Sequence, residues 1–183
     1  MRTLRAGLTA LVGATLLLVA LPAAAGAATA STTTTFTLTG GALSITAPST
    51  TVNLASVSVS ASAITAQLGT ITVHDGRGLL NGSWTSTVSS SRFTTEGQTS
   101  TETINATSVA YWSGAPIATS GVGTLQGGEL TPGAAVVIDA AQTAFTGGSL
   151  IGNNSASWNP TLITIPAAEV VGTYTGTVTH TVA

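Results

Sequence analysis

The chain has 183 residues and no cysteine, and only 5% of its residues are charged against 43% that are hydrophobic. This balance excludes an intrinsically disordered chain, which needs high charge and low hydrophobicity, and it excludes a disulfide framework. Arginine is the only basic residue besides histidine, and the chain has too few of them to neutralise a row of phosphates, so nucleic acid and anionic lipid are poor partners.

Residues 1–30 have the layout of a secretory signal peptide. Two arginines precede an apolar run, residues 8–21, which is followed by a proline and small residues. The run is shorter than the roughly 20 residues of a membrane-spanning helix, so we expect cleavage, with no membrane anchor in the mature form. Small-x-small cleavage patterns end at Ala25, Ala27 and Ala30. We take residues 31–183 as the mature chain, which has the length of one domain and which we expect to be secreted.

Alternation of apolar residues with threonine, serine and asparagine begins at Phe36 and is the pattern of half-buried β-strands. Turn signals such as Asp75-Gly76 and Asn81-Gly82 separate the runs. Residues 140–144 are the one short helical candidate, and residues 96–107 are predicted to form a surface loop or an edge strand. We therefore predict an all-β single domain over residues 31–183, an antiparallel β-sandwich or jelly-roll-like body.

The most regular alternation lies in residues 173–182 near the C-terminus. Tyr174, Val178 and Val182 share one face with His180, and threonines line the other face. We predict that this segment is a structural closing strand inside a sheet. His180 then belongs to the inward face, where we expect a neutral and partly buried imidazole.

No set of residues has the spacing of a catalytic or metal-binding site. His74 and His180 lie in no His-x-x-x-His pattern, no Gly-x-Ser-x-Gly nucleophile elbow is present, and the six carboxylates are scattered along the chain. We therefore expect no enzymatic activity, no catalytic residue, no metal site and no cofactor.

Aromatic side chains are the main candidates for contact with a ligand, because exposed rings stack on sugar faces. Trp84, Trp158 and Tyr174 lie in alternating runs, which favours a place in the core. Tyr111 and Trp112 are adjacent, so their side chains point to opposite faces of a strand. This pair is the best candidate for an exposed ring.

Asp75 and Arg77 flank a glycine in a predicted tight turn. A functional interpretation has Arg77 bind a carboxylate of a ligand. The favoured interpretation is structural, with Asp75 capping the turn and Arg77 paired with it or bonded to loop carbonyls.

Three segments, residues 70–93, 155–167 and 172–183, carry linked motifs. A strand with a Val-x-Asp-x-Arg-Gly turn precedes a tryptophan strand, and the chain ends on a Gly-Thr-Tyr strand. In these motifs the chain resembles the WxL domain of Gram-positive cell-surface proteins. Its amino-acid composition resembles that of actinobacterial exported proteins. The matching residues are Val73, Asp75, Arg77, Gly78, Trp84, Gly172, Thr173, Tyr174, Val178 and Thr179. The two signature Trp-x-Leu motifs read Trp84-Thr85-Ser86 and His180-Thr181-Val182 here.

The resemblance implies a non-enzymatic domain held non-covalently on the cell wall, with peptidoglycan or another wall-associated surface protein as its partner. The family's two motifs place Trp84 and His180 among the binding candidates. The full candidate set is Trp84, Tyr111, Trp112, Trp158, His180, Asp75 and Arg77. The alternative is a secreted structural protein that assembles with itself, because strands rich in threonine and free of lysine lack the charges that discourage edge-to-edge pairing.

Overall fold

The computed structural model describes residues 28–54, 56–59, 63–164 and 170–183. The chain divides into two units, of which the first ends at Thr37 and the second spans Leu38–Ala183. In the first unit, residues 28–37 are exposed and belong to no helix or strand. Most of the predicted signal peptide lies outside the described residues.

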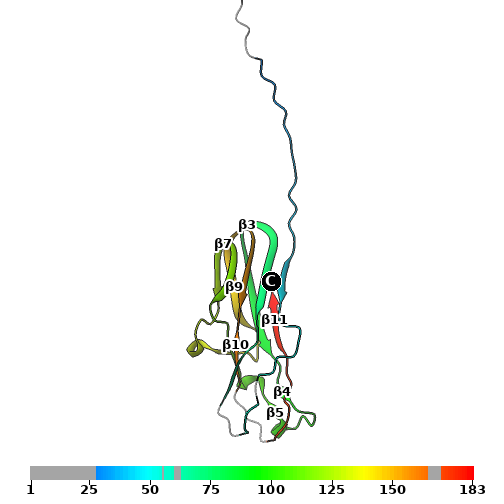
Figure 1. Cartoon of the computed structure of the whole chain (residues 1–183), viewed down its shortest axis with the longest axis vertical. Coiled ribbons are helices and arrows are strands. Elements are labelled where there is room, and N and C mark those ends of the chain that lie inside the picture. Colours follow the sequence, from blue (N-terminus) through cyan, green and yellow to red (C-terminus); the bar gives the residue numbers. More distant parts are fainter. Residues whose placement is uncertain (1–27, 55, 60–62, 165–169) are drawn as a thin grey trace, which may run out of the picture. The chain divides into compact units, whose positions relative to one another are not determined.

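The regular structure of the second unit consists of antiparallel strands and short 3₁₀ turns, which confirms the predicted all-β sandwich (Figure 1). The strands are β1 (Leu43–Thr46), β2 (Ile64–Gln67), β3 (Ile71–Ser90), β4 (Phe93–Thr94), β5 (Thr103–Ile104), β6 (Val109–Trp112), β7 (Pro116–Gly127), β8 (Val136–Val137), β9 (Gln142–Trp158), β10 (Thr161–Thr164) and β11 (Val178–Val182). Short 3₁₀ turns are η1 (Ser100–Glu102), η2 (Ala106–Ser108) and η3 (Pro132–Ala134).

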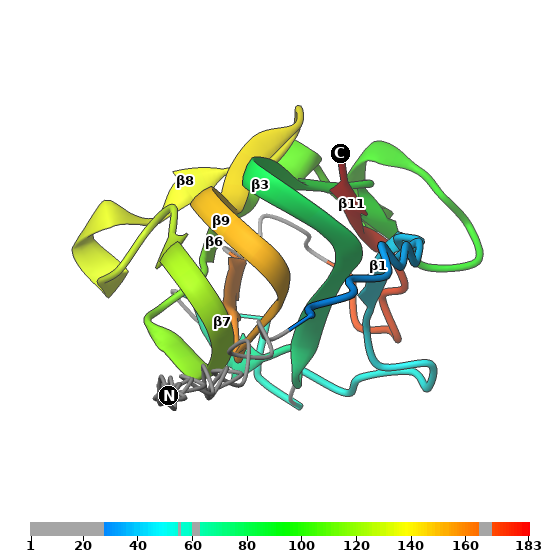
Figure 2. The same ribbon diagram turned by 90° about the horizontal axis from the view of Figure 1, so that it is seen from above.

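Three sheets organise the described strands. The largest has the order β1-β3-β9-β7, and β11 also pairs with β3. A second sheet has the order β2-β10-β6-β8, and β4 pairs with β5 in a small ribbon. Figure 2 views the molecule from above and places β7 and β11 on opposite sides.

The long strands β3 and β9 form one ribbon that bends back on itself. Their pairing runs from Ile71 opposite Trp158 to Val88 opposite Gln142, with several register shifts between. Trp84 is opposite Gly147 in the register, yet its indole nitrogen is 2.9 Å from Asn154 Oδ1, much farther along β9. This contact requires the two halves of the ribbon to face each other, and Figure 1 shows β3 turning over near its label.

The prediction that Asp75-Gly76 and Asn81-Gly82 separate two strands is wrong, because both pairs lie inside β3, where the strand bends. Gly78 (φ 66°) and Asn81 (φ 60°) adopt the left-handed conformation that glycine and asparagine tolerate. Ser149 (φ 52°) and Gly152 (φ 70°) do the same in the facing part of β9. Matching irregularities in both strands bend the pair without ending it.

Two further predictions differ in detail from the structure. The predicted short helix over residues 140–144 is wrong, because Gln142–Ala144 begin β9, where they extend the ladder opposite β3. The closing strand is shorter than residues 173–182. Regular pairing starts at Val178, and before it Gly176 passes over Phe93, where an added Cβ would lie 2.7 Å from the ring.

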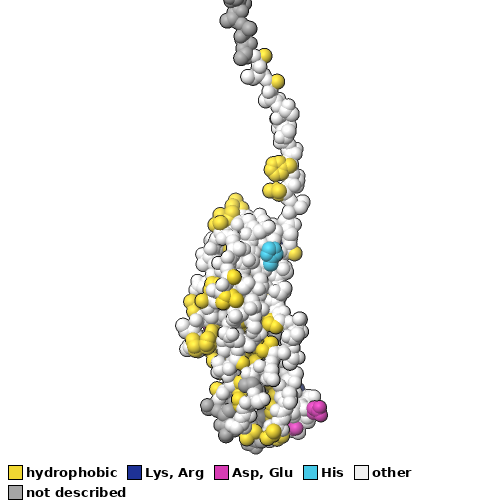
Figure 3. Space-filling view, viewed as in Figure 1, with side chains coloured by type: hydrophobic (Ala, Val, Ile, Leu, Met, Phe, Trp, Pro, Cys, Tyr) yellow, Lys and Arg dark blue, Asp and Glu magenta, His cyan; other side chains and the backbone are white. Residues whose placement is uncertain are grey.

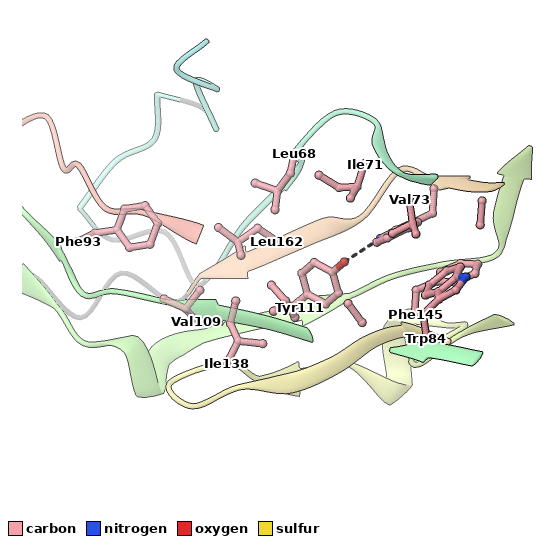
Figure 4. Packing of buried hydrophobic residues seen from close by; sticks show 14 of the residues in the cluster. Leu68, Ile71, Val73, Trp84, Phe93, Val109, Tyr111, Ile138, Phe145 and Leu162 are labelled. Carbon is pink, nitrogen blue, oxygen red and sulfur yellow. Dashed lines mark hydrogen bonds between the residues drawn. The ribbon is translucent and has the colours of Figure 1, made fainter. Parts of the chain in front are cut away.

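The core lies between the bent sheet and the second sheet (Figure 4). Its largest fully buried side chains include Trp158, Tyr111, Phe145 and Leu150. Trp84 is also buried, at 2% exposure, so the expectation that Trp84 and Trp158 belong to the core is confirmed. Tyr174 is partly buried and packs against the same cluster.

Candidate binding site

An open groove of about 360 Å³ lies beside β11. Its floor is apolar and includes Leu68, Phe93 and Leu162, which Figure 4 shows together at one end of the core. Threonines, among them Thr51 and Thr177, add hydroxyl groups to the lining. The lining therefore offers a ligand both apolar contact and hydroxyl groups.

His180 is the titratable side chain among the described residues that line the groove. Strand β11 directs it inward, and its Nε2 lies 3.2 Å from the Tyr111 hydroxyl. Burial lowers the pKa of His180 from 6.5 to about 4, because the charged imidazolium loses hydration. The imidazole is therefore neutral at neutral pH, in agreement with the sequence-based prediction.

Tyr111 and Trp158 stand behind His180 and are fully buried. The Trp158 indole N–H donates to the Tyr111 hydroxyl over 3.0 Å, the bond that Figure 4 marks with a dashed line. Burial raises the pKa of Tyr111, so its hydroxyl keeps its proton. Because that oxygen already accepts from Trp158, its own proton is free for donation to His180 Nε2.

Tyr111 and Trp112 form the pair proposed as the best candidate for an exposed ring, and this proposal does not hold for Tyr111, which is fully buried. The two side chains do point to opposite faces, as the strand period requires. Tyr111 points into the core, where its hydroxyl has partners, and Trp112 is half-buried on the other face. Sequence parity shows that the two faces of β6 differ but not which of them the bent sheet covers.

A stack of aromatic rings connects Trp158 to the far end of the core. The ring centroids of Trp158 and Phe145 are 4.6 Å apart, and those of Phe145 and Trp84 are 6.1 Å apart. Trp84 then donates its indole N–H to Asn154 Oδ1 at 2.9 Å. Asn154 in turn donates from Nδ2 to Asp75 Oδ2 at 3.3 Å.

Asp75 and Arg77 close this chain of contacts with an ion pair. Asp75 Oδ1 accepts the backbone N–H of Arg77 at 3.0 Å and its Nε–H at 2.9 Å, and Oδ2 accepts from Nη2 at 3.0 Å. Arg77 also donates to the Ser83 carbonyl at 2.8 Å. The bonds from Arg77 lower the pKa of Asp75 to about 2. The predicted pairing of Asp75 with Arg77 is thus present, in the bend of β3 in place of a simple turn.

Six of the seven candidate residues therefore belong to one connected set of side-chain contacts, and Trp112 lies outside it. Sequence analysis missed two of its members. Asn154 lies in an Asn-Asn pair, which has the composition of a turn, and Phe145 lies in a glycine-rich stretch, so neither residue has the sequence signal of a core position. Of the residues in this connected set, only His180 lines the groove.

The geometry contains no metal centre among the described residues, because no group of three or more histidine, aspartate or glutamate side chains is close enough to hold an ion. In the same part of the chain, no helix has the length and apolar character needed to span a membrane. Comparison with protein-family models, curated proteins and solved structures gave no match. The likeness to the WxL domain therefore rests on the motifs alone.

The lowered pKa of His180 predicts that mild acid weakens the fold. The imidazole of the unfolded chain takes up a proton near pH 6.5, whereas the folded chain does so only near pH 4. Between these values the unfolded state binds more protons, so the free energy of unfolding falls as the pH falls. The expected loss is on the order of 3 kcal/mol at most, from about 1.4 kcal/mol per unit of pKa shift.

Urea unfolding at neutral pH and near pH 4, compared between the wild-type chain and His180→Gln, checks this. We expect the variant to lose less stability than the wild type over this interval. His74→Gln, at an exposed position, is the matched control and should follow the wild type. The comparison between variants is needed because burial raises the pKa of Glu129, which acts in the opposite direction. Equal pH dependence in His180→Gln and the wild type would contradict the assignment.

Proposed function

We propose that the chain is an exported, non-enzymatic cell-surface domain that associates non-covalently with the cell wall, through peptidoglycan or a wall-bound partner. The observation that carries the proposal is the groove beside β11. Its floor offers apolar side chains to a sugar face, and its threonines offer hydroxyl groups for hydrogen bonds. His180, which stands where the resembled family has a signature tryptophan, lies in the wall of that groove.

The electrostatic character of the groove favours an uncharged ligand. No charged side chain is among the described lining residues, and His180 is neutral at neutral pH because burial lowers its pKa. Recognition would therefore rest on ring contact and hydroxyl bonding, which suits a glycan better than a charged peptide. The hydrogen bond with the buried Tyr111 hydroxyl fixes the orientation of the His180 ring.

Retention of the purified mature chain on insoluble cell wall tests the proposal, with an unrelated washed protein as a background control. We expect retention above background for the wild type and a several-fold loss for Thr177→Glu, which adds charge and bulk inside the groove. Thr179→Glu is the matched control, because Thr179 is exposed on the same segment but does not line the groove. Wild-type retention at the background level, or equal loss in both variants, would overturn the proposal.

Self-assembly outside the cell is the second candidate function, and one observation favours it. Strand β7 is a sheet edge of 12 residues without a charged side chain. Natural edge strands usually carry charged side chains, proline, bulges or a cover that discourages pairing with another chain. Strand β7 has Pro116 at its start and register shifts in its ladder with β9, but it has no charge. Light scattering over a concentration series separates the two functions, because a chain that is monomeric throughout and still binds walls supports only the first.

A further inference from the structure

We propose that one copy of the chain donates residues 31–39 as an extra strand to the free edge of β7 in a second copy. This inference rests on the second candidate function, self-assembly, and names the two surfaces that would join. Because donor and acceptor are different surfaces, the contact is head-to-tail and would extend into a filament.

The donor segment has the pattern of a strand without a partner. In residues 31–39, Phe36 and Leu38 alternate with threonines, the period of a strand with one apolar face. Both apolar side chains are 86% exposed, and residues 28–42 belong to no strand. An apolar face of this kind gains most from burial against another sheet.

The backbone bonds beside β3 stop short of this segment. On the β1 side of β3, Gly41 donates to the Gly76 carbonyl and Gly76 donates to the Ala42 carbonyl. Just beyond, β3 leaves its straight course at Gly78, where φ is 66°. Among the described residues, no backbone bond joins residues 31–39 to a strand.

The acceptor is the outer edge of β7. Among the described strands, β7 pairs with β9 alone, and eight consecutive residues from Ile117 to Thr124 are exposed. Gly121 (φ 92°) and Gly123 (φ 133°) bend its second half, and a register shift separates Pro116 from Ala118, so the regular stretch for pairing is residues 118–120. The donor of nine residues spans roughly 30 Å at about 3.3 Å per residue, which is ample to cover it.

The register shows which backbone groups of this edge are free. Gly76 bonds toward β1, and the bonding direction alternates along an antiparallel strand. Val73 therefore bonds toward β9, and its partner Ala156 bonds toward β3. The residues on either side of Ala156 must then bond toward β7.

Those neighbours are Ser155 and Ser157, whose partners on β7 are Ser120 and Ala118. Thr119, between the two, directs its N–H and C=O away from β9 and toward the open side. Its side chain lies on the same face as Ala156, its partner in the register, which is fully buried. A donated strand with Phe36 and Leu38 on that face would extend the apolar layer past the present edge.

Charge places no obstacle in the way of this pairing. Neither residues 31–39 nor β7 contains a charged side chain, so like-charge repulsion across the new ladder is absent. Ile117, at 57% exposure, is a large apolar side chain on the acceptor strand that the donated strand would partly cover.

Multi-angle light scattering of the mature chain over a wide concentration range tests the proposal. We expect the mass to rise from one copy to two or more. The donor double variant Phe36→Asp with Leu38→Asp should stay at one copy at every concentration. The matched control, Thr35→Asp with Thr37→Asp, adds the same charge to the opposite face of the segment and should assemble as the wild type does.

The acceptor side is tested with Thr119→Pro, which removes the outward N–H without touching a bond to β9, and with Thr119→Ala as its control. Ile117→Lys, a charge at an exposed edge position, is the second acceptor variant in case the proline perturbs folding, which melting curves reveal. Each acceptor variant should stay at one copy, and Thr119→Ala should assemble.

Mixing the donor variant with an acceptor variant is the decisive experiment. One still offers β7 and the other still offers residues 31–39, so the mixture should form a complex of one copy of each. A wild-type chain that stays at one copy, equal assembly of both double-aspartate variants, or a mixture without this complex would overturn the proposal. Wall retention of the donor variant, measured separately, keeps this outcome distinct from the proposed wall association.

Discussion

Removal of the closing strand is expected to unfold the domain and not merely to detach it from the cell wall. A chain that ends at Gly172 loses β11, which pairs with the second half of β3 from Ser90 to Ser86. It also loses the backbone bonds between Ala183 and Thr85 that end the ladder. The truncation therefore strips the neighbouring strand from the second half of β3, while β1 still pairs with the first half.

The packing cost is larger than the loss of these backbone bonds. Val178 and Val182 are half-buried against the core, and His180 covers Tyr111 and Trp158. Full burial of such side chains contributes about 1.5 to 3 kcal/mol each, against a total stability of about 5 to 15 kcal/mol for a domain. Losing the strand, and with it partly buried Tyr174, would consume most of that total.

Thermal unfolding followed by circular dichroism is the measurement. We expect no cooperative transition for the chain that ends at Gly172. The matched control lacks residues 31–37, which lie outside the second unit, and should melt close to the full mature chain. A cooperative transition of the C-terminal truncation near the full-length temperature would show that β11 is peripheral.

The features predictable from sequence were those that depend on neighbours along the chain. The period of two predicted strands over most of the second unit and placed His180 on the inward face of β11. The ion pair of Asp75 with Arg77 joins residues two positions apart, so local chemistry was sufficient to predict it. Local reasoning likewise showed that Tyr111 and Trp112 face opposite ways.

The features that could not be predicted depend on pairing between distant segments. Glycine and asparagine near Asn81 permit a positive φ, and this is compatible with either a hairpin or a bend. Only the matching irregularities of β9, about 70 positions away, decide for a bend. The groove is equally non-local, because it needs residues 47–54, Leu162 and β11 in one place.

The bond between Trp84 and Asn154 is the clearest product of the bend and leads to the second large prediction. Asn154 is 2% exposed and satisfies two buried groups at once, the Trp84 indole N–H and Asp75 Oδ2. Asn154→Ala leaves both groups without this partner and opens a small cavity. The Trp84 N–H is then buried without a partner, which costs about 1 to 3 kcal/mol, whereas Asp75 Oδ2 keeps its bond from Arg77. With the cavity added, we expect a loss of roughly 2 to 4 kcal/mol in the free energy of unfolding.

Chemical denaturation of the variant measures that loss, and the adjacent residue provides the matched control. Asn153 has the same side chain, is exposed, and belongs to the same strand, so Asn153→Ala should change stability by no more than about 0.5 kcal/mol. Asp75 keeps its bonds to Arg77 in either variant, so its carboxylate should stay ionised at neutral pH and the loss should not depend on pH there. Equal, small effects of the two substitutions would mean that the two halves of the bent ribbon hold together without this bond, and that ring stacking through Phe145 suffices.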